Sequence, residues 1–215
     1  MRAKQTLQSN HKQTRCDQTP HIDHYWLLLV YNLFHVRMRI LGIDPSFSSL
    51  GMCLYNTEDT STHYYLITEH PTKKLQNYSS PHLTQYFYIS ADKNDKTADM
   101  RLIRDIITTL LINIKPDWVF IESPALRIVS RSASPLAGLN YVIRLACLDN
   151  NIPCTAIPPT HIKKQFAGSG WATKNEMIEQ WLLHDPHAPL IDIKKKDDLA
   201  DAFSLAFIGG QELSN

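Results

Sequence analysis

The sequence predicts an α/β protein in which helices cover both faces of a mixed sheet. Three observations predict this class. Short apolar runs of strand length follow one another in residues 40–68, a long amphipathic helix pattern comes next, and apolar runs then alternate with helix patterns as far as residue 208. With 215 residues, of which 43% are hydrophobic and 20% charged, the chain can form an ordinary apolar core.

The first three expected strands are residues 40–43, 51–55 and 63–68. Each is a largely apolar run, and segments rich in Ser, Asn and Asp separate them. Strands joined by such turns pair in antiparallel order, so we expect a three-stranded meander. Residues 70–98 are polar and irregular, although residues 85–89 have the composition of a short strand.

The remaining elements alternate between helix and strand. Leu and Ile recur at helical spacing in residues 102–114, which predicts a helix with one apolar face, and Pro116 ends it. Residues 118–121 and 155–157 are the other expected strands, so the meander and these parallel strands form a five-stranded sheet. The other expected helices are residues 135–148, 160–167, 174–183 and 197–208, the last ended by Gly209-Gly210.

Overall charge and composition exclude several classes of protein. The net charge of +1 indicates no general attraction to nucleic acid or to a membrane surface. The four cysteines are dispersed without a CxxC pair, which argues against a zinc knuckle and favours a reducing compartment. The longest apolar run, residues 25–34, is too short to span a bilayer, and mostly polar residues precede it. We therefore expect a cytoplasmic protein with no membrane partner.

Residues 1–37 differ in composition from the rest of the chain. They contain five basic residues, two acidic residues and four histidines. Since the whole chain carries +1, residues 38–215 carry a net charge of about −2. We expect residues 1–37 to be an extension, either flexible or produced by an upstream start codon with Met38 as the natural start. Residues 38–215 are then the functional domain.

Four acidic residues stand where folding alone would not place them. Asp44 and Glu122 each directly follow an apolar strand run, so each carboxylate lies at the end of a buried strand, where an uncompensated charge is costly. Asp198 and Asp201 are three residues apart and therefore share one helix face. Small and apolar residues continue that face, so we expect it to pack on the sheet and bring the four carboxylates together.

Carboxylates gathered at one point repel one another unless cations are bound. Oxygen ligands without His or Cys favour Mg²⁺ or Mn²⁺, and two such ions about 4 Å apart suit in-line attack on a phosphodiester. The pattern therefore indicates a phosphoryl-transfer site. Other roles remain open for each acid alone: Asp44 as a turn cap, Glu122 as a partner of Arg127, and Asp198 as a helix N-cap.

Four segments, taken in order, resemble motifs of the RuvC-type Holliday junction resolvases, which have the ribonuclease H-like fold. They are Ile40-Leu41-Gly42-Ile43-Asp44-Pro45-Ser46, Ile121-Glu122, the lysine-bearing residues 162–174, and Asp198-Leu199-Ala200-Asp201-Ala202. The resemblance extends from residue 40 to about residue 209. Asp197 beside Asp198 leaves the register of the last motif open, and the family's Asp-x-x-Asp-Ala spacing favours Asp198.

This resemblance implies a structure-selective endodeoxyribonuclease that resolves four-way DNA junctions in recombination and repair. It implies two Mg²⁺ ions per active site, with Mn²⁺ as a substitute, and water as the nucleophile. The implied catalytic and metal-binding residues are Asp44, Glu122, Asp198 and Asp201. It also implies a homodimer that acts on four-way or branched DNA and has no small-molecule substrate.

A nearly neutral nuclease must concentrate its cations near the active site, because phosphate contacts supply most of the affinity for DNA. Lys163 and Lys174 match the family's functional lysines. The other candidates are Lys164, Arg127, Arg131 and residues 194–196. In the same region, residues 168–170 are either a phosphate-binding nest or a plain turn, and Trp171 either stacks on a base or belongs to the core.

A symmetric four-way substrate calls for two active sites related by a twofold axis. Tyr141, Val142 and Leu145, in the expected helix at residues 135–148, belong either to such a dimer interface or to the core. The chain departs from the family at Ser46, where Gly is common, and at Ser123-Pro124-Ala125, where bacterial members commonly carry an aromatic residue. The second departure removes the direct implication of base stacking at that position.

Other functions compete with junction resolution. A nuclease of the same fold could have a broader branched-DNA, flap or RNA·DNA hybrid substrate, since fold does not set the substrate. A sugar-kinase or actin-like ATPase also opens with an Asp-containing strand and turn, but this chain lacks a second Gly-rich loop and has about half the needed length. A module that only binds would not need all four acids.

Overall fold

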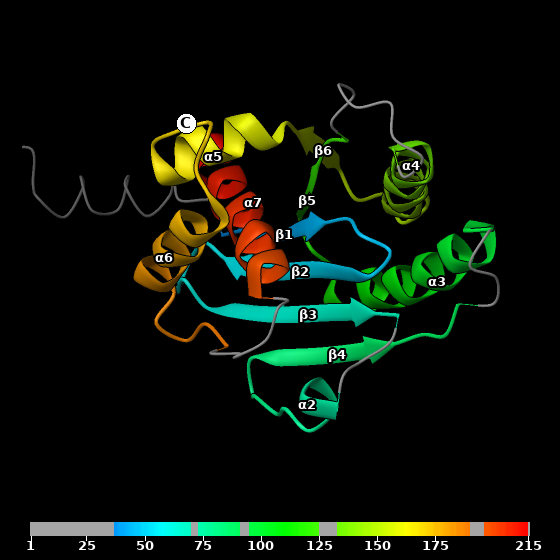
Figure 1. Cartoon of the computed structure of the whole chain (residues 1–215). Helices are drawn as coiled ribbons and strands as arrows, with labels where there is room; N and C mark the ends of the chain where they lie inside the picture. Colours follow the sequence, from blue (N-terminus) through cyan, green and yellow to red (C-terminus); the bar gives the residue numbers. More distant parts are fainter. Residues whose placement is uncertain (1–36, 70–72, 91–94, 125–132, 190–195, 215) are drawn as a thin grey trace, which may run out of the picture. The chain divides into compact units, whose positions relative to one another are not determined.

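The computed structural model describes residues 37–69, 73–90, 95–124, 133–189 and 196–214. The expected extension, residues 1–37, lies outside this part of the chain except for Arg37. One sheet with the strand order β4-β3-β2-β1-β5-β6 runs through the described domain (Figure 1). Its strands are β1 (Arg39–Asp44), β2 (Ser49–Asn56), β3 (Thr62–Thr68), β4 (Leu83–Phe87), β5 (Trp118–Glu122) and β6 (Cys154–Ile157).

The pairing of the strands agrees with the predicted meander and parallel strands. β1, β2 and β3 pair in antiparallel order, while β5 pairs in parallel with β1 and β6 in parallel with β5. The prediction of five strands was wrong, because β4 adds a sixth in parallel to β3. An edge strand has one neighbouring strand and needs few apolar residues. Leu83 reaches the core, but Thr84 and Gln85 obscure the apolar alternation that is typical of a strand.

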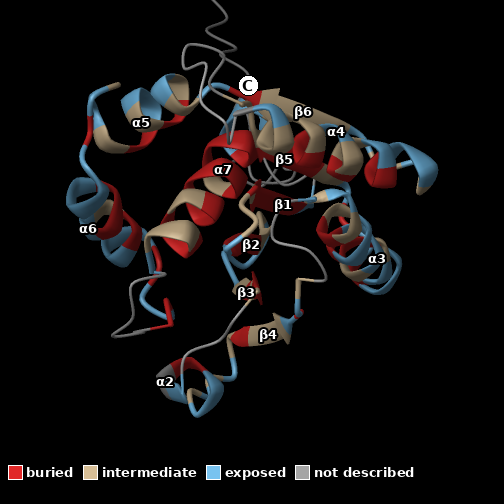
Figure 2. Cartoon of the chain, turned by 45° about the vertical axis from the view of Figure 1, so that its right-hand side comes forward, coloured by how far each residue is buried: buried red, intermediate tan, exposed pale blue. Residues whose placement is uncertain are grey.

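Helices cover both faces of the sheet, as the sequence predicted (Figure 1). Ile40 and Phe120 of the strands pack against α5, α6 and α7, whereas Leu41 and Val119, their sequence neighbours, pack against α3 and α4. Figure 2 shows the buried residues of α3, α4 and α7 on the sides that face the sheet. The helices are α2 (Lys73–Gln76), α3 (Thr97–Ile114), α4 (Ala133–Asp149), α5 (Pro159–Ala167), α6 (Lys174–His184) and α7 (Lys196–Ser214).

Helix α7 continues past the point where the sequence predicted its end. Gly209 and Gly210 lie inside the helix, which runs on to Ser214. A Cβ atom on Gly209 would lie 2.2 Å from Cδ2 of Phe120, so this glycine lets the helix backbone pack against β5. Packing on the sheet therefore outweighs the helix-ending tendency of the glycine pair.

None of the helices in the described ranges combines the length and the apolar character that a bilayer-spanning helix requires. Three cysteines fall in these ranges, Cys53, Cys147 and Cys154, and each is a free thiol.

Candidate active site

Two of the predicted carboxylates leave the sheet at the same edge. Asp44 is the last residue of β1 and Glu122 is the last residue of β5. These strands are parallel neighbours with Ile43 opposite Ile121. Asp44 and Glu122, which follow them, therefore stand side by side. Ile43 and Ile121 pack toward α3 and α4, and the alternation of a strand therefore directs Asp44 and Glu122 to the face covered by α7.

The first turns of α7 bring three more carboxylates to that edge. Asp197, Asp198 and Asp201 lie near its N-terminus and are all half-buried. Gly51 is the register partner of Asp44, and a Cβ atom there would lie 2.2 Å from the carbonyl oxygen of Asp198. The helix backbone therefore packs directly on β2 beside Asp44. We call Asp44, Glu122, Asp197, Asp198 and Asp201 the carboxylate cluster.

Burial and mutual repulsion raise the pKa values in the carboxylate cluster. Burial raises the pKa of Asp44 well above its usual range, and the charges of the other four members, Glu122 foremost, raise it further. Burial and the charge of Asp201 raise the pKa of Glu122 to about 7, although Lys163 opposes the shift. Burial likewise raises the pKa of Asp201 to about 6. Burial and repulsion therefore disfavour the charged forms of these carboxylates when no cation is bound.

The predicted lysines take different places around the cluster. Lys163 of α5 donates from Nζ to the carbonyl oxygen of Ala172 at 2.9 Å. It also lies close enough to Glu122 and Asp201 to oppose the rise in their pKa values. Lys174 begins α6 and donates to the Asp197 carboxylate, a hydrogen bond that raises the pKa of this lysine. Two cations from neighbouring helices therefore stand at the rim of the carboxylate cluster.

The other predicted DNA contacts are Lys164, residues 194–196, Arg127 and Arg131. Lys164 is exposed on α5 and lines an open depression together with Trp171. Lys196, the last residue of the predicted 194–196 run, is exposed at the start of α7. Arg127, Arg131 and residues 194–195 lie outside the described residues. Their proposed contacts with DNA therefore remain predictions.

The structure adds Asn140, which the sequence did not single out. Its buried side chain on α4 donates from Nδ2 to the carbonyl oxygen of Glu122 at 2.7 Å. The backbone N–H of Ser123 donates to the carbonyl oxygen of Ile157 at 2.9 Å, so the end of β5 is held on two sides. The sequence contains one signal of this role, which is a polar residue between Leu139 and Ile143 in an apolar helix pattern.

The turn that follows Asp44 is also anchored. The Tyr88 hydroxyl donates a hydrogen bond to the carbonyl oxygen of Phe47, and Nζ of Lys96 lies 5.7 Å from the centroid of the Phe47 ring. Lys96 in turn pairs with the buried Asp99 at 2.7 Å. These contacts connect the turn between β1 and β2 to the start of α3.

The donor set fits a hard divalent cation. Within the described ranges, no group of three or more carboxylate, His or Cys side chains forms a ready-made metal site. The cluster nevertheless offers only oxygen atoms, which Mg²⁺ and Mn²⁺ prefer. Its carboxylates are partly buried and repel one another, and a bound cation would reverse that repulsion. Asp44, Glu122, Asp198 and Asp201 come from three elements of the fold, and their role as metal ligands remains a prediction.

Comparison with known proteins identifies relatives of one kind. The chain is 25% identical over 175 residues to the crossover junction endodeoxyribonuclease RuvC of Carboxydothermus hydrogenoformans, covering 80% of this chain and 95% of the relative. It is 28% identical over 174 residues to the RuvC of Caldicellulosiruptor saccharolyticus, covering 79% and 90%. The chain is therefore similar to RuvC proteins over about four fifths of its length. No family model matches it.

Two solved structures have folds similar to that of this chain. Thermus thermophilus RuvC in complex with a Holliday junction substrate superposes with a TM-score of 0.59 at 17% identity, over 82% of this chain and 97% of that one. The yeast mitochondrial Holliday junction resolvase Ydc2 superposes with a TM-score of 0.52 at 14% identity, over 83% and 80%. The predicted family resemblance and ribonuclease H-like fold are confirmed, apart from the additional strand β4.

Proposed function

We propose that this chain is a structure-selective endodeoxyribonuclease that resolves four-way DNA junctions. The observation that carries the proposal is the carboxylate cluster, in which the ends of β1 and β5 meet the first turns of α7. The sequence relatives support it, since they are named crossover junction endodeoxyribonucleases. We assign the activity to residues 38–215 and propose the cytoplasm as its place of action.

The proposed reaction is hydrolysis of a phosphodiester by water. Two Mg²⁺ ions, or Mn²⁺ in their place, held by Asp44, Glu122, Asp198 and Asp201, would activate the water and stabilise the leaving oxygen. Lys163 and Lys174 offer ammonium groups to the oxygens of the scissile phosphate. Because Lys163 is held by the carbonyl of Ala172, its charge is already positioned before DNA arrives.

A set of labelled substrates tests the proposal. With Mg²⁺, the full chain is expected to nick a four-way junction at two symmetric positions and leave ends that DNA ligase can rejoin. A flap, an RNA·DNA hybrid and a linear duplex of the same sequence are expected to be cut at least tenfold more slowly, since the proposed selectivity is for structure. Equal cutting of the flap or the hybrid would contradict junction resolution and favour the broader nuclease.

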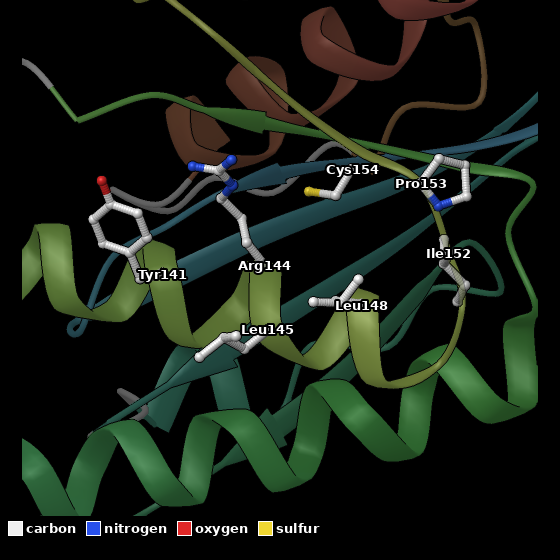
Figure 3. A pocket seen from close by; sticks show the side chains of 7 residues that line it. All are labelled: Tyr141, Arg144, Leu145, Leu148, Ile152, Pro153 and Cys154. Atoms are coloured by element: carbon white, nitrogen blue, oxygen red, sulfur yellow. The ribbon is translucent and has the colours of Figure 1, made fainter.

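We also propose that the enzyme is a homodimer whose interface includes the outer face of α4. Tyr141, Leu145 and Leu148 are exposed there, and Leu148 is 69% exposed. Figure 3 shows these side chains with Arg144 along one groove of about 330 Å³, whose other lining residues are Ile152, Pro153 and Cys154. Two cuts in a symmetric junction need two active sites, and a second copy of the chain would cover this apolar row through a twofold interface.

A charge placed on this face is expected to separate the subunits. Leu145→Lys would have to bury its ammonium at the interface, so we expect a monomer and the loss of paired nicks, with single nicks remaining. Sedimentation equilibrium measures the mass, and a junction labelled on two strands measures the pairing of cuts. The matched control is Ile112→Lys on the exposed side of α3, which is expected to remain a dimer. A dimeric Leu145→Lys protein would exclude this face.

A further inference from the structure

An exposed tryptophan borders an open depression next to the carboxylate cluster. Trp171 is 89% exposed, more than any other large hydrophobic side chain in the described ranges, whereas Trp118 and Trp181 pack into the core. It lines a depression of about 450 Å³, which we call the Trp171 depression. The other lining residues are Pro158, Thr160, His161, Lys164 and Gly170.

The loop that carries Trp171 keeps its shape without the indole. The backbone N–H of Trp171 donates to Oγ of Ser169 at 3.2 Å, and Thr173 with Glu176 forms a capping box at the start of α6. Gly170 packs closely on α5, since a Cβ atom there would lie 3.2 Å from the carbonyl oxygen of Thr160. The side chain of Trp171 therefore has no packing role that would explain a large apolar group in water.

Two connections place the Trp171 depression beside the carboxylate cluster. Pro158 directly follows Ile157, which is the register partner of Glu122 at the end of β5. On the other side, the carbonyl of Ala172, the residue after Trp171, accepts the hydrogen bond from Lys163. Pro158 and Trp171 both line the depression. Each is therefore next in sequence to a residue that contacts either the carboxylate cluster or Lys163 at its rim.

We propose that Trp171 stacks on a nucleobase of the DNA strand that adjoins the scissile phosphate, while Lys164 contacts a neighbouring phosphate. This inference rests on the proposed nuclease function. The flat π-face of an indole stacks on any base, and such a stack contributes about 1–3 kcal/mol of binding free energy. The depression suits a nucleotide because it combines this apolar face with the exposed Lys164, and DNA held by Lys163 and Lys174 would extend over it.

Binding by variants of the full chain tests the stack. In an Asp44→Asn background, which prevents cutting, Trp171→Ala is expected to weaken the Kd for a four-way junction by about 5- to 150-fold, as loss of one stacked base requires. Trp171→Phe is expected to restore most of the affinity, because it restores an aromatic face. Lys164→Ala is expected to weaken binding and reduce its dependence on salt concentration. Ile112→Ala on α3 is the matched exposed control and is expected to bind unchanged.

A fluorescent base reports the stack itself. Junctions with 2-aminopurine at successive positions beside the cut are expected to show one position that is quenched by the Trp171 protein and not by Trp171→Ala. Suppose that the wild-type protein cuts the junction, and that Trp171→Ala binds it with the same Kd and quenches the same base. That result would overturn the stack and leave the proposed function standing. A wild-type protein that neither binds nor cuts the junction would overturn the proposed function together with the stack.

Discussion

Asp44→Asn and Glu122→Gln are each expected to lower the rate of junction cutting by roughly 10³-fold or more. Each substitution keeps the shape of the side chain and removes one negative charge from the carboxylate cluster, so metal assistance worth several kcal/mol is lost. Affinity for the junction is expected to persist, because the proposed phosphate contacts come from lysines outside these strand ends. Single-turnover cutting and equilibrium binding, measured on the same labelled junction, separate the two effects.

The same variants are expected to be more stable than the wild-type protein when metal is removed. The pKa of Glu122 rises from 4.5 to about 7 on folding, so its contribution is most favourable below pH 4.5 and is lost as the pH rises through 7. At pH 8 in EDTA, Glu122→Gln should therefore gain on the order of 2 kcal/mol of unfolding free energy. Added Mg²⁺ should stabilise the wild-type protein more than the variant.

The matched control for both measurements is Asp105→Asn. Asp105 is exposed on α3, on the opposite face of the sheet, and is expected to change neither cutting nor stability. Full cutting by Asp44→Asn would contradict the metal-binding role of the carboxylate cluster. A metal-free Glu122→Gln protein less stable than the wild type at pH 8 would show that a hydrogen bond, rather than burial and repulsion, governs this carboxylate.

The second large effect is expected from Gly42→Ala, which should destabilise the fold by about 3 kcal/mol or more. A Cβ atom on Gly42 would lie 2.1 Å from the carbonyl oxygen of Ala202 and 2.7 Å from the backbone nitrogen of Ala206. Both are backbone atoms in the middle of α7, so the whole helix must move away from β1. Thermal unfolding should show a decrease of roughly 2–4 °C in Tm for each kcal/mol lost.

Gly138→Ala is the control for this substitution. A Cβ atom on Gly138 would lie 3.0 Å from Cε of Met100, which is the far end of a flexible side chain. Because alanine also favours the helical conformation of α4, we expect Gly138→Ala to be neutral or slightly stabilising. A Gly42→Ala protein with an unchanged Tm would mean that α7 does not pack on β1 as closely as the structure shows.

Local patterns were sufficient to predict where four of the five carboxylates of the cluster would stand. An apolar run of strand length that ends in Asp44 or Glu122 predicts a strand and its last residue together, because alternation and burial are properties of neighbouring residues. The spacing of Asp198 and Asp201 predicts a shared helix face for the same reason. The role of these residues as metal ligands remains a prediction.

Features that depend on contacts between distant segments were missed or misjudged. Residues 85–89 had the composition of a short strand, but the bounds of β4 and its parallel pairing with β3 at the edge of the sheet depend on contacts that a sequence pattern does not report. Asn140 is 18 residues from Glu122 in the sequence, and only the packing of α4 on the sheet shows that it holds the end of β5. Lys174 and Asp197 are brought together from two helices in the same way.

By itself, the sequence determined the fold class, the strands and helices that carry the motifs, and the four acids expected to bind metal. The tertiary structure decided three further matters: that α7 continues through Gly209 and Gly210, that Asp197 joins the carboxylate cluster, and that Trp171 is exposed beside it. The physical reason is the range of the interactions. Periodicity reports how a residue relates to its neighbours in the chain, whereas burial, close backbone packing and electrostatic repulsion depend on which distant segment lies opposite.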